Sequence, residues 1–202
     1  MIFPFLASMS ALRLETARPA LDLGTPELVE QLRRGDLQAL GRVYDQHHEA
    51  VRAFAGRLIG DAAIAEDLVH DVFVALPSLL QRYRGDSSLR SFLIGVAINQ
   101  ARHHVRSASR RRAAIERLGS EPARQSRSPE ADAEARRFID GVERALDRLP
   151  LEQRVAFVLC EVEERSAAEA AAIVGAPEAT LRTRLHHARK KLQAALDKAG
   201  LV

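Results

Sequence analysis

Two clusters of basic residues have the clearest potential chemistry in this sequence. Between residues 101 and 112 the chain has five arginines and no acidic residue, and residues 177–191 contain three arginines and two lysines against Glu178 alone. Arginine and lysine neutralise phosphates and release the counterions condensed on nucleic acid. Each cluster is therefore a candidate phosphate-binding face, the alternative being an ordinary solvated charged helix face.

The spacing of the second cluster predicts a helix that can also read bases. One face is apolar at three- and four-residue steps and predicts packing; it consists of Leu181, Leu185, Ala188 and Leu192. The opposite face is polar and consists of Arg182, Thr183, His186, His187 and Lys190. In a major groove, arginine can read guanine edges, and threonine or histidine can exchange hydrogen bonds with bases.

The residues before this helix predict a helix-turn-helix. Ser166 and Glu169 fit the S-x-x-E capping box of a short helix over 167–174, and Gly175 is a candidate C-cap. Pro177 favours the start of the next helix. A short helix, a tight turn with glycine and a longer basic helix together are typical of this DNA-binding motif.

The first cluster belongs to another predicted helix, which Ser87 or Ser88 can cap and which runs from Leu89 to about Arg106 or beyond. Its polar face consists of Asn99, Arg102, His103, Arg106 and Arg110, and its packing face of Leu89, Phe92, Leu93, Val96, Ala97 and Ala101. Asparagine followed by stepped basic residues can read bases and hold phosphates. An Arg-rich solvated helix end that runs into a linker is the alternative.

Composition and periodicity predict an all-α protein of two small helical domains. Aromatic residues make up only 4% of the 202 residues, while helix-forming residues dominate. Further helices are predicted from Asp36 to Arg57, closed by Gly60, and after an Asp61 N-cap with an apolar stripe as far as Leu76, where Pro77 perturbs the last part of the helix. Two more are predicted before the helix-turn-helix, one from Glu130 to Pro150 and one over 151–162. The predicted domains are a flexible extension 1–24, a first domain 25–112, a linker 113–131 and a second domain 132–202.

Several function classes are not expected. The sequence has no P-loop, nucleophile elbow or zinc-type cluster, and six of the seven histidines form adjacent pairs that diverge by about 100° on a helix. We therefore predict no enzyme activity, cofactor, metal or small-molecule substrate. Cys160, the only cysteine, excludes an intrachain disulfide, and we assign it to packing rather than redox sensing. No stretch approaches the roughly 20 apolar residues of a membrane span, so we predict a cytoplasmic protein.

Two sets of motifs resemble the extracytoplasmic-function (ECF) sigma factors of bacterial RNA polymerase. Residues 61–73 (DAAIAEDLVHDVF), 83–87 (YRGDS) and 98–102 (INQAR) resemble their region 2. Leu149-Pro150, Gln153-Arg154, the segment 167–175 and residues 180–189 (TLRTRLHHAR) resemble their region 4. The resemblance spans about residues 30 to 197 in the family's order. It implies a factor that directs core polymerase to promoters, recognises the minus-35 duplex and melts the minus-10 element.

The resemblance implies three sites and their partners. The second helix of region 2, which is acidic from Asp61 to Leu76, would bind the clamp helices of the largest polymerase subunit, or would serve solubility alone; its candidates are Asp67, His70, Asp71 and Val74. The candidates for minus-10 binding are Arg84, Gly85, Asp86, Ser87, Asn99, Arg102, His103 and Arg106. Tyr83 would either stack on a base or pack in the core. The candidates for minus-35 binding are Thr180, Arg182, Thr183, His186, His187 and Lys190. Region 4 would also contact the polymerase flap, and an anti-sigma factor would hold the protein inactive.

Three positions depart from the family's pattern. His70 replaces a common glutamine, Glu178-Ala179 replaces a residue-glycine pair, and His187 stands where arginine is frequent. The change at His70 affects polymerase binding, and the change at His187 affects base preference.

The alternative functions are a two-domain helix-turn-helix regulator that does not bind core polymerase, and a helical interaction scaffold. Transcription with core polymerase separates the first alternative from a sigma factor, and a salt-dependent DNA shift argues against the second.

Overall fold

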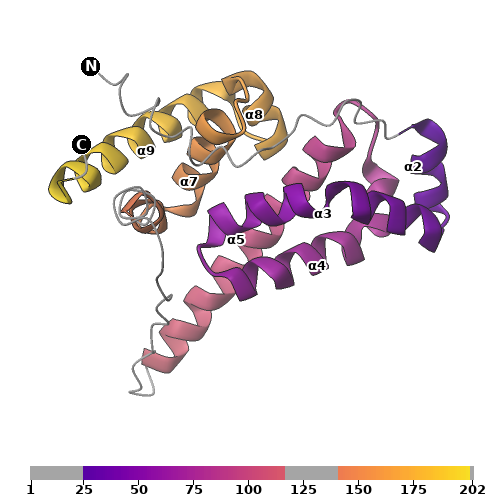
Figure 1. Ribbon diagram of the computed structural model, residues 1–202, viewed down its shortest axis with the longest axis horizontal. Helices are drawn as coiled ribbons and strands as arrows, with labels where there is room; N and C mark the ends of the chain where they lie inside the picture. The colour runs from indigo at the N-terminus through magenta and orange to yellow at the C-terminus, as the bar shows by residue number, and fades with distance from the viewer. Residues whose placement is uncertain (1–24, 117–140, 201–202) are drawn as a thin grey trace, which may run out of the picture.

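The regular elements of the computed structural model, which describes residues 25–116 and 141–200, are all helical (Figure 1). An N-terminal bundle contains α2 (Pro26–Arg33), α3 (Leu37–Ile59), α4 (Ala62–Leu79), the 3₁₀ turn η2 (Leu80–Arg82) and α5 (Leu89–Glu116). A C-terminal bundle contains helical residues 141–147, α7 (Leu151–Phe157), the π turn η3 (Val158–Val162), α8 (Ala167–Val174) and α9 (Glu178–Lys198). The predicted all-α fold of two helical domains is confirmed over this part of the chain.

Side chains cap the long helices of the N-terminal bundle where the sequence predicts. Asp36 accepts hydrogen bonds from the first turn of α3, and Asp61 accepts them from the backbone N–H groups of Ala63 and Ile64 at 2.9 and 3.1 Å. Gly60 ends α3 with a φ of 71°, a left-handed conformation that glycine adopts without steric cost. Helix α4 continues through Pro77 to Leu79, so the proline that the sequence places in its last part does not end it. Helix α5 continues to Glu116, past the predicted domain boundary after residue 112.

The helix-turn-helix forms from the predicted signals. Ser166 and Glu169 make both bonds of the capping box of α8, and Gly175 ends α8 with a φ of 68°. Pro177 is the N-cap of α9 rather than its first residue. The predicted helix over 151–162 is α-helical only to Phe157 and then widens into the π turn η3. Phe138 and Ile139, part of the apolar stripe predicted after Glu130, lie outside the described residues.

The two bundles pack directly against each other, with α8 beside α5 and α7 against α3 (Figure 1). Buried apolar residues from both bundles belong to one continuous core cluster. The helices approach closely at Gly95 of α5, where a Cβ atom would lie 3.3 Å from the carbonyl oxygen of Ile173 in α8. A small residue at position 95 therefore allows the two helices to come together.

A buried arginine of α7 binds the end of α3. Arg154 is 7% exposed, and its Nη1 donates to the Leu58 carbonyl at 2.7 Å and to Oδ1 of Asp147 at 3.0 Å. The last carbonyls of a helix have no partner within the helix and carry partial negative charge, so a guanidinium is favourable there. The Asp147 carboxylate lies so close to Gly60 that a Cβ atom at position 60 would be 2.1 Å from it. Arg154 and Gly60 thus fix the corner where the C-terminal bundle meets α3.

Two carboxylates of the C-terminal bundle bind arginines of the N-terminal bundle. The Glu163 side chain is 6% exposed and lies 2.8 Å from Nη2 of Arg90 and 3.5 Å from Nη1 of Arg57. Glu152 accepts hydrogen bonds from Nε and Nη2 of Arg102 at 2.8 and 3.0 Å, and its Oε2 lies 2.8 Å from Nη1 of Arg184 in α9. The hydrogen bonds from Arg102 are the main reason that the pKa of Glu152 is held below its usual range; burial opposes this shift, and the charges of Arg102, Arg184 and Arg106 reinforce it.

The Asp61 cap predicts a measurable loss of stability. We expect Asp61→Ala to lower the free energy of unfolding by about 1 kcal/mol, because two backbone N–H groups of α4 lose their acceptor. Asp61→Asn should stay close to the wild type, since asparagine caps equally well. Urea unfolding followed by circular dichroism measures both. An alanine variant as stable as the asparagine variant would contradict the cap.

The ion pairs of Glu152 predict an unusual titration. A carboxylate with a depressed pKa in the folded state contributes stability that is complete above the ordinary pKa of glutamate and is lost as the pH falls through the depressed value. We therefore expect the Glu152 carboxyl carbon, followed by NMR in the full chain, to titrate below the usual glutamate range. In Arg102→Gln the pKa should move back toward that range. A pKa that is identical in the two proteins would show that the pair with Arg102 does not form in solution.

Candidate nucleic-acid and protein interfaces

Helix α9 presents the predicted base-reading face to solvent. Arg182, Thr183, His186, His187 and Lys190 are all exposed, and Thr180 is half-buried in the first turn. The predicted packing residues Leu181, Leu185, Ala188 and Leu192 are buried, together with Leu196. The structure thus brings the six predicted minus-35 residues together on the helix that follows the tight turn.

Internal contacts fix two side chains of this face. Arg182 pairs with Glu178 one turn earlier, and the Thr183 hydroxyl donates to the Ala179 carbonyl at 2.9 Å. The rings of His186 and His187 lie edge to face, with centroids 5.7 Å apart. Both histidines are exposed, and an imidazole can donate to or accept from base edges, so His187 keeps hydrogen-bonding capacity where the family often has arginine.

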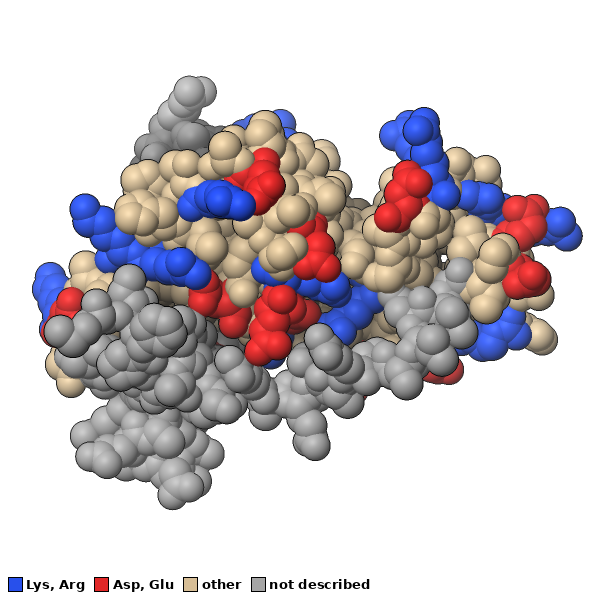
Figure 2. Space-filling view, turned by 90° about the horizontal axis from the view of Figure 1, so that it is seen from above, with Lys and Arg blue, Asp and Glu red and all other residues tan. Residues whose placement is uncertain are grey.

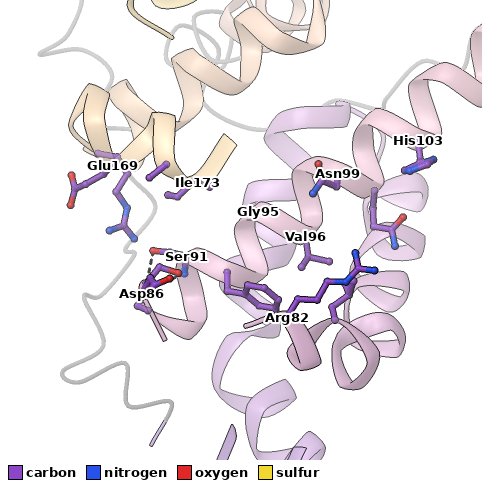
Figure 3. Close-up of a pocket in the computed structure, with 16 residues that line it drawn as sticks. Arg82, Asp86, Ser91, Gly95, Val96, Asn99, His103, Glu169 and Ile173 are labelled. Atoms are coloured by element: carbon purple, nitrogen blue, oxygen red, sulfur yellow. Dashed lines mark hydrogen bonds between the residues drawn. The ribbon is translucent and has the colours of Figure 1, made fainter. Parts of the chain in front are cut away.

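The predicted minus-10 residues lie along α5 and the loop before it. Figure 3 shows Asn99 and His103 on α5 and Asp86 in the loop, around a groove of about 860 Å³ whose other wall includes Glu169 and Ile173 of α8. The loop also lines a second hollow of about 590 Å³, which takes in all four of its predicted residues, Arg84, Gly85, Asp86 and Ser87. These residues and Asn99, His103 and Arg106 are exposed. The loop therefore stands between two concave surfaces of a size that could take a nucleotide base.

Tyr83 packs in the core. It is 9% exposed, its ring lies 5.0 Å from that of Phe92, and its hydroxyl donates to the Ser87 carbonyl at 2.5 Å. The guanidinium of Arg33 donates to the carbonyls of Leu80 and Tyr83 at 3.0 and 2.5 Å. Of the two roles left open by the sequence, the structure favours packing, and Tyr83 holds the loop at both ends.

Arg102 differs from its neighbours on α5. Its side chain is 18% exposed, because Glu152 holds Nε and Nη2, while Nη1 donates to Oδ1 of Asn99 at 3.0 Å. Sequence reasoning placed Arg102 on an open DNA-binding face and missed Glu152, Arg154 and Glu163 as interface residues. The one local signal was a charged residue, Arg154, within the otherwise apolar run 154–160.

The predicted polymerase-binding residues form one exposed stripe on α4. Asp67, His70, Asp71 and Val74 are spaced by three, one and three residues, and all are exposed. Val74 is 64% exposed although it is apolar. The residues between them, Leu68, Val69, Val72 and Phe73, are buried. An apolar side chain beside carboxylates at helical spacing is a surface that fits a protein partner with apolar and basic residues.

The structure also bears on the sequence predictions for Cys160, for metal ligands and for membrane spans. Cys160 is half-buried against the core, and burial, followed by the charge of Glu161, raises the pKa of its thiol, which disfavours the reactive thiolate. In the parts of the chain that the structure describes, no three or more His, Cys, Asp or Glu side chains gather as metal ligands. No helix in those same parts is long and apolar enough to cross a membrane.

Comparison with known proteins places both bundles in one family. Residues 43–111 match the family model "Sigma-70 region 2", and residues 139–192 match "Sigma-70, region 4". The RNA polymerase sigma-H factor of Pseudomonas aeruginosa is 27% identical over 179 residues, which cover 85% of this chain and 93% of that protein. The ECF RNA polymerase sigma-E factor of Escherichia coli K12 is 27% identical over 173 residues, covering 82% and 90%.

Solved structures agree with these matches. The sigma factor RpoE of Bartonella quintana, in complex with the anti-sigma factor NepR, superposes with a TM-score of 0.62 at 25% identity, covering 78% of this chain and 96% of that one. CnrH, in complex with the cytosolic domain of CnrY, superposes with a TM-score of 0.59 at 27% identity, covering 85% and 96%. The two family matches, in order and together over more than half of the chain, favour the sigma reading over a regulator with a helix-turn-helix alone. The chain belongs to the sigma-70 family, as an RNA polymerase sigma factor of the extracytoplasmic-function type.

Proposed function

We propose that the chain divides promoter recognition between its two bundles and binds core polymerase through α4. In this assignment α9 reads the minus-35 duplex, while α5 and the loop before it hold the melted minus-10 strand. The observation that carries the proposal is the exposure of three chemically different faces on one chain: the polar face of α9, the polar face of α5 and the acidic, apolar stripe of α4.

The charge of each face supports its partner. The polar faces of α9 and α5 consist of basic or neutral residues and suit phosphates and base edges. The α4 stripe would repel DNA, because Asp67 and Asp71 are exposed. Its exposed Val74 suits instead a protein surface, for which the clamp helices of the largest polymerase subunit are the candidate. Contact of the C-terminal bundle with the polymerase flap belongs to the same proposal.

We also propose a cytoplasmic location, no catalytic activity of its own and control by an anti-sigma factor. The support for the inhibitor is that the similar RpoE was solved with the anti-sigma factor NepR. The support for the location and for the lack of catalysis is the proposed role itself, since polymerase and promoter DNA are cytoplasmic and polymerase supplies the chemistry.

Reconstitution with core polymerase tests the α4 assignment. The wild type with core should start transcription at promoters mapped from transcript ends in cells that overproduce it. We expect Val74→Asp to weaken core binding at least about tenfold, since it replaces the one apolar side chain of the stripe with a further charge. Leu37→Asp is the matched control, because Leu37 is an apolar residue 79% exposed outside the stripe. Equal affinities of the two variants would contradict the α4 site, and a wild type that never transcribes with core would contradict the function.

Single substitutions on α9 should separate base reading from phosphate binding. We expect Arg182→Ala to relax the preference at one minus-35 base pair by about tenfold to a hundredfold. Lys190→Ala should weaken binding to all promoters alike and reduce the slope of log affinity against log salt by about 1. Lys198→Ala, at the far end of α9, serves as control. Holoenzyme binding to a set of promoter variants measures all three, and an unchanged preference in Arg182→Ala would remove Arg182 from the reading face.

A further inference from the structure

Helix α2 forms one wall of the hollow beside the loop that precedes α5. Pro26, Val29 and Arg33 of α2 line this hollow of about 590 Å³, and residues 83–89 line the rest of it. The family model for region 2 matches from residue 43 onward, so α2 lies outside the matched segment. The sequence predicted no site residue in α2, yet the structure places it beside the predicted minus-10 residues.

Arg33 joins α2 to the turn that leads into this loop. Its Nε donates to the Leu80 carbonyl at 3.0 Å, and its Nη2 donates to the Tyr83 carbonyl at 2.5 Å. The backbone carbonyl of Arg33 in turn accepts a hydrogen bond from Nε2 of Gln81 at 3.3 Å. A guanidinium presents several N–H donors in one rigid plane, so it can hold two carbonyls at once. Arg33 therefore fixes both ends of η2 against α2.

Tyr83 carries this anchor across the loop. Its carbonyl is held by Arg33, its hydroxyl donates to the Ser87 carbonyl at 2.5 Å, and its ring packs against Phe92. The residues between, 84–86, are exposed and form no helical turn. A segment with few buried contacts of its own takes its order from the anchors at its ends. The shape of the loop thus depends on a chain of contacts that begins at Arg33.

We propose that Arg33 is a positioning residue for promoter melting, which holds the loop before α5 in the shape in which residues 84–87 take a melted minus-10 base. This inference rests on the proposed role of that loop in minus-10 binding. Arg33 acts through the loop rather than on DNA, because its Nε and Nη2 are bonded to carbonyls and its Nη1 lies 3.7 Å from Oε2 of Glu30. A loop that is held in place beforehand loses less conformational freedom when it binds.

The charges around α2 are mixed, so a general attraction for phosphates does not account for Arg33. Figure 2 shows acidic and basic side chains next to one another at the end of the molecule that α2 occupies. The neighbouring Arg34 has the same charge, and its side chain is 75% exposed. Its Nε donates to Oε1 of Glu30 at 3.2 Å, so its ion pair stays at the end of α2. Arg34→Gln is therefore a matched control for Arg33→Gln.

Hydrogen exchange of the full-length protein without DNA tests the positioning itself. We expect Arg33→Gln to speed the exchange of the amides of residues 83–88 about threefold to tenfold, because two carbonyls lose their donors. Arg34→Gln should leave these amides unchanged. The amides of α9 report on the stability of the whole fold, and they should exchange alike in all three proteins.

Holoenzyme binding to a series of probes tests the link to the melted base. Each probe has a mapped promoter with a single-stranded minus-10 segment, in which one base at a time is replaced by an abasic site. The wild type should lose at least about fivefold in affinity at the position whose base the loop takes. Arg33→Gln should bind the complete probe about threefold to tenfold more weakly than the wild type. On the probe that lacks this base, the two proteins should differ by less than about twofold.

Tyr83→Phe tests the same chain of contacts without a change in α2. It removes the hydroxyl that donates to the Ser87 carbonyl and keeps the ring against Phe92. It should speed the exchange of the loop amides and show the same selective loss of affinity on the complete probe. This variant keeps the inference testable even where Arg33→Gln detaches α2.

Three results would overturn the inference. They are equal exchange of the loop amides in Arg33→Gln and Arg34→Gln, a loss of affinity in Arg33→Gln that is the same on every probe, and wild-type behaviour of Tyr83→Phe. A failure of the proposed function looks different. In that case no abasic site weakens the binding of the wild-type holoenzyme, while hydrogen exchange still shows whether Arg33 orders the loop.

Discussion

The arrangement of the two bundles depends on a guanidinium at the end of a helix. Arg154 reaches across 96 residues of sequence to the Leu58 carbonyl, and it can do so because Gly60 turns the chain away without a side chain. Burial lowers the pKa of Arg154, and the charge of Asp147 opposes that shift. A guanidinium buried without partners would be strongly destabilising, so the Leu58 carbonyl and Asp147 together make the position tolerable. Once this corner is fixed, α7 lies on α3, and the carboxylates of Glu152 and Glu163 come within reach of the arginines of α3 and α5.

The same electrostatics explains why a DNA-binding chain has acidic residues inside its own contact surface. Arg57, Arg90 and Arg102 lie on the N-terminal side of the contact, and without counter-charges apolar packing would have to overcome the cost of taking them out of water. Glu163 supplies the opposite charge for Arg57 and Arg90, and Glu152 supplies it for Arg102. The π turn η3 comes directly before Glu163, which bonds through its backbone N–H to the Val158 carbonyl at 2.9 Å, five residues back. Wide turns of this kind occur often at functional positions, because they change the direction of the side chains that follow.

The sequence predicted the features that depend on residues close together in the chain, namely the helix caps and the helix faces. Asp36, Asp61 and the pair Ser166 and Glu169 are read from spacing alone, because a cap bonds to backbone within three residues. The buried faces of α5 and α9 follow from helical periodicity, and their polar faces follow by elimination. The contact between the bundles could not be predicted this way. Its ion pairs join residues 50 to 106 positions apart, and a glutamate such as Glu152 in a sequence looks the same whether it faces water or an arginine of another bundle. The resemblance to a family supplied the function and placed Arg102 among the minus-10 candidates, but it gave no sign that Glu152 would bind the Arg102 side chain.

Whether such a contact can regulate depends on its net strength rather than on the number of its ion pairs. Bringing charges together out of water costs nearly as much as their attraction returns, so the paired carboxylates of Glu152 and Glu163 contribute little net free energy. Separation leaves no charge stranded, because Glu152, Glu163 and their arginines all become hydrated. The two states therefore differ by far less than the sum of their contacts suggests, and a partner that binds only the separated form can shift the balance by its differential affinity alone. In the proposed function one chain binds core polymerase through α4 and promoter DNA through α5 and α9. Any arrangement of the bundles that both ligands favour then makes each ligand raise the affinity of the other by linkage, even though the two ligands need not touch the same residue.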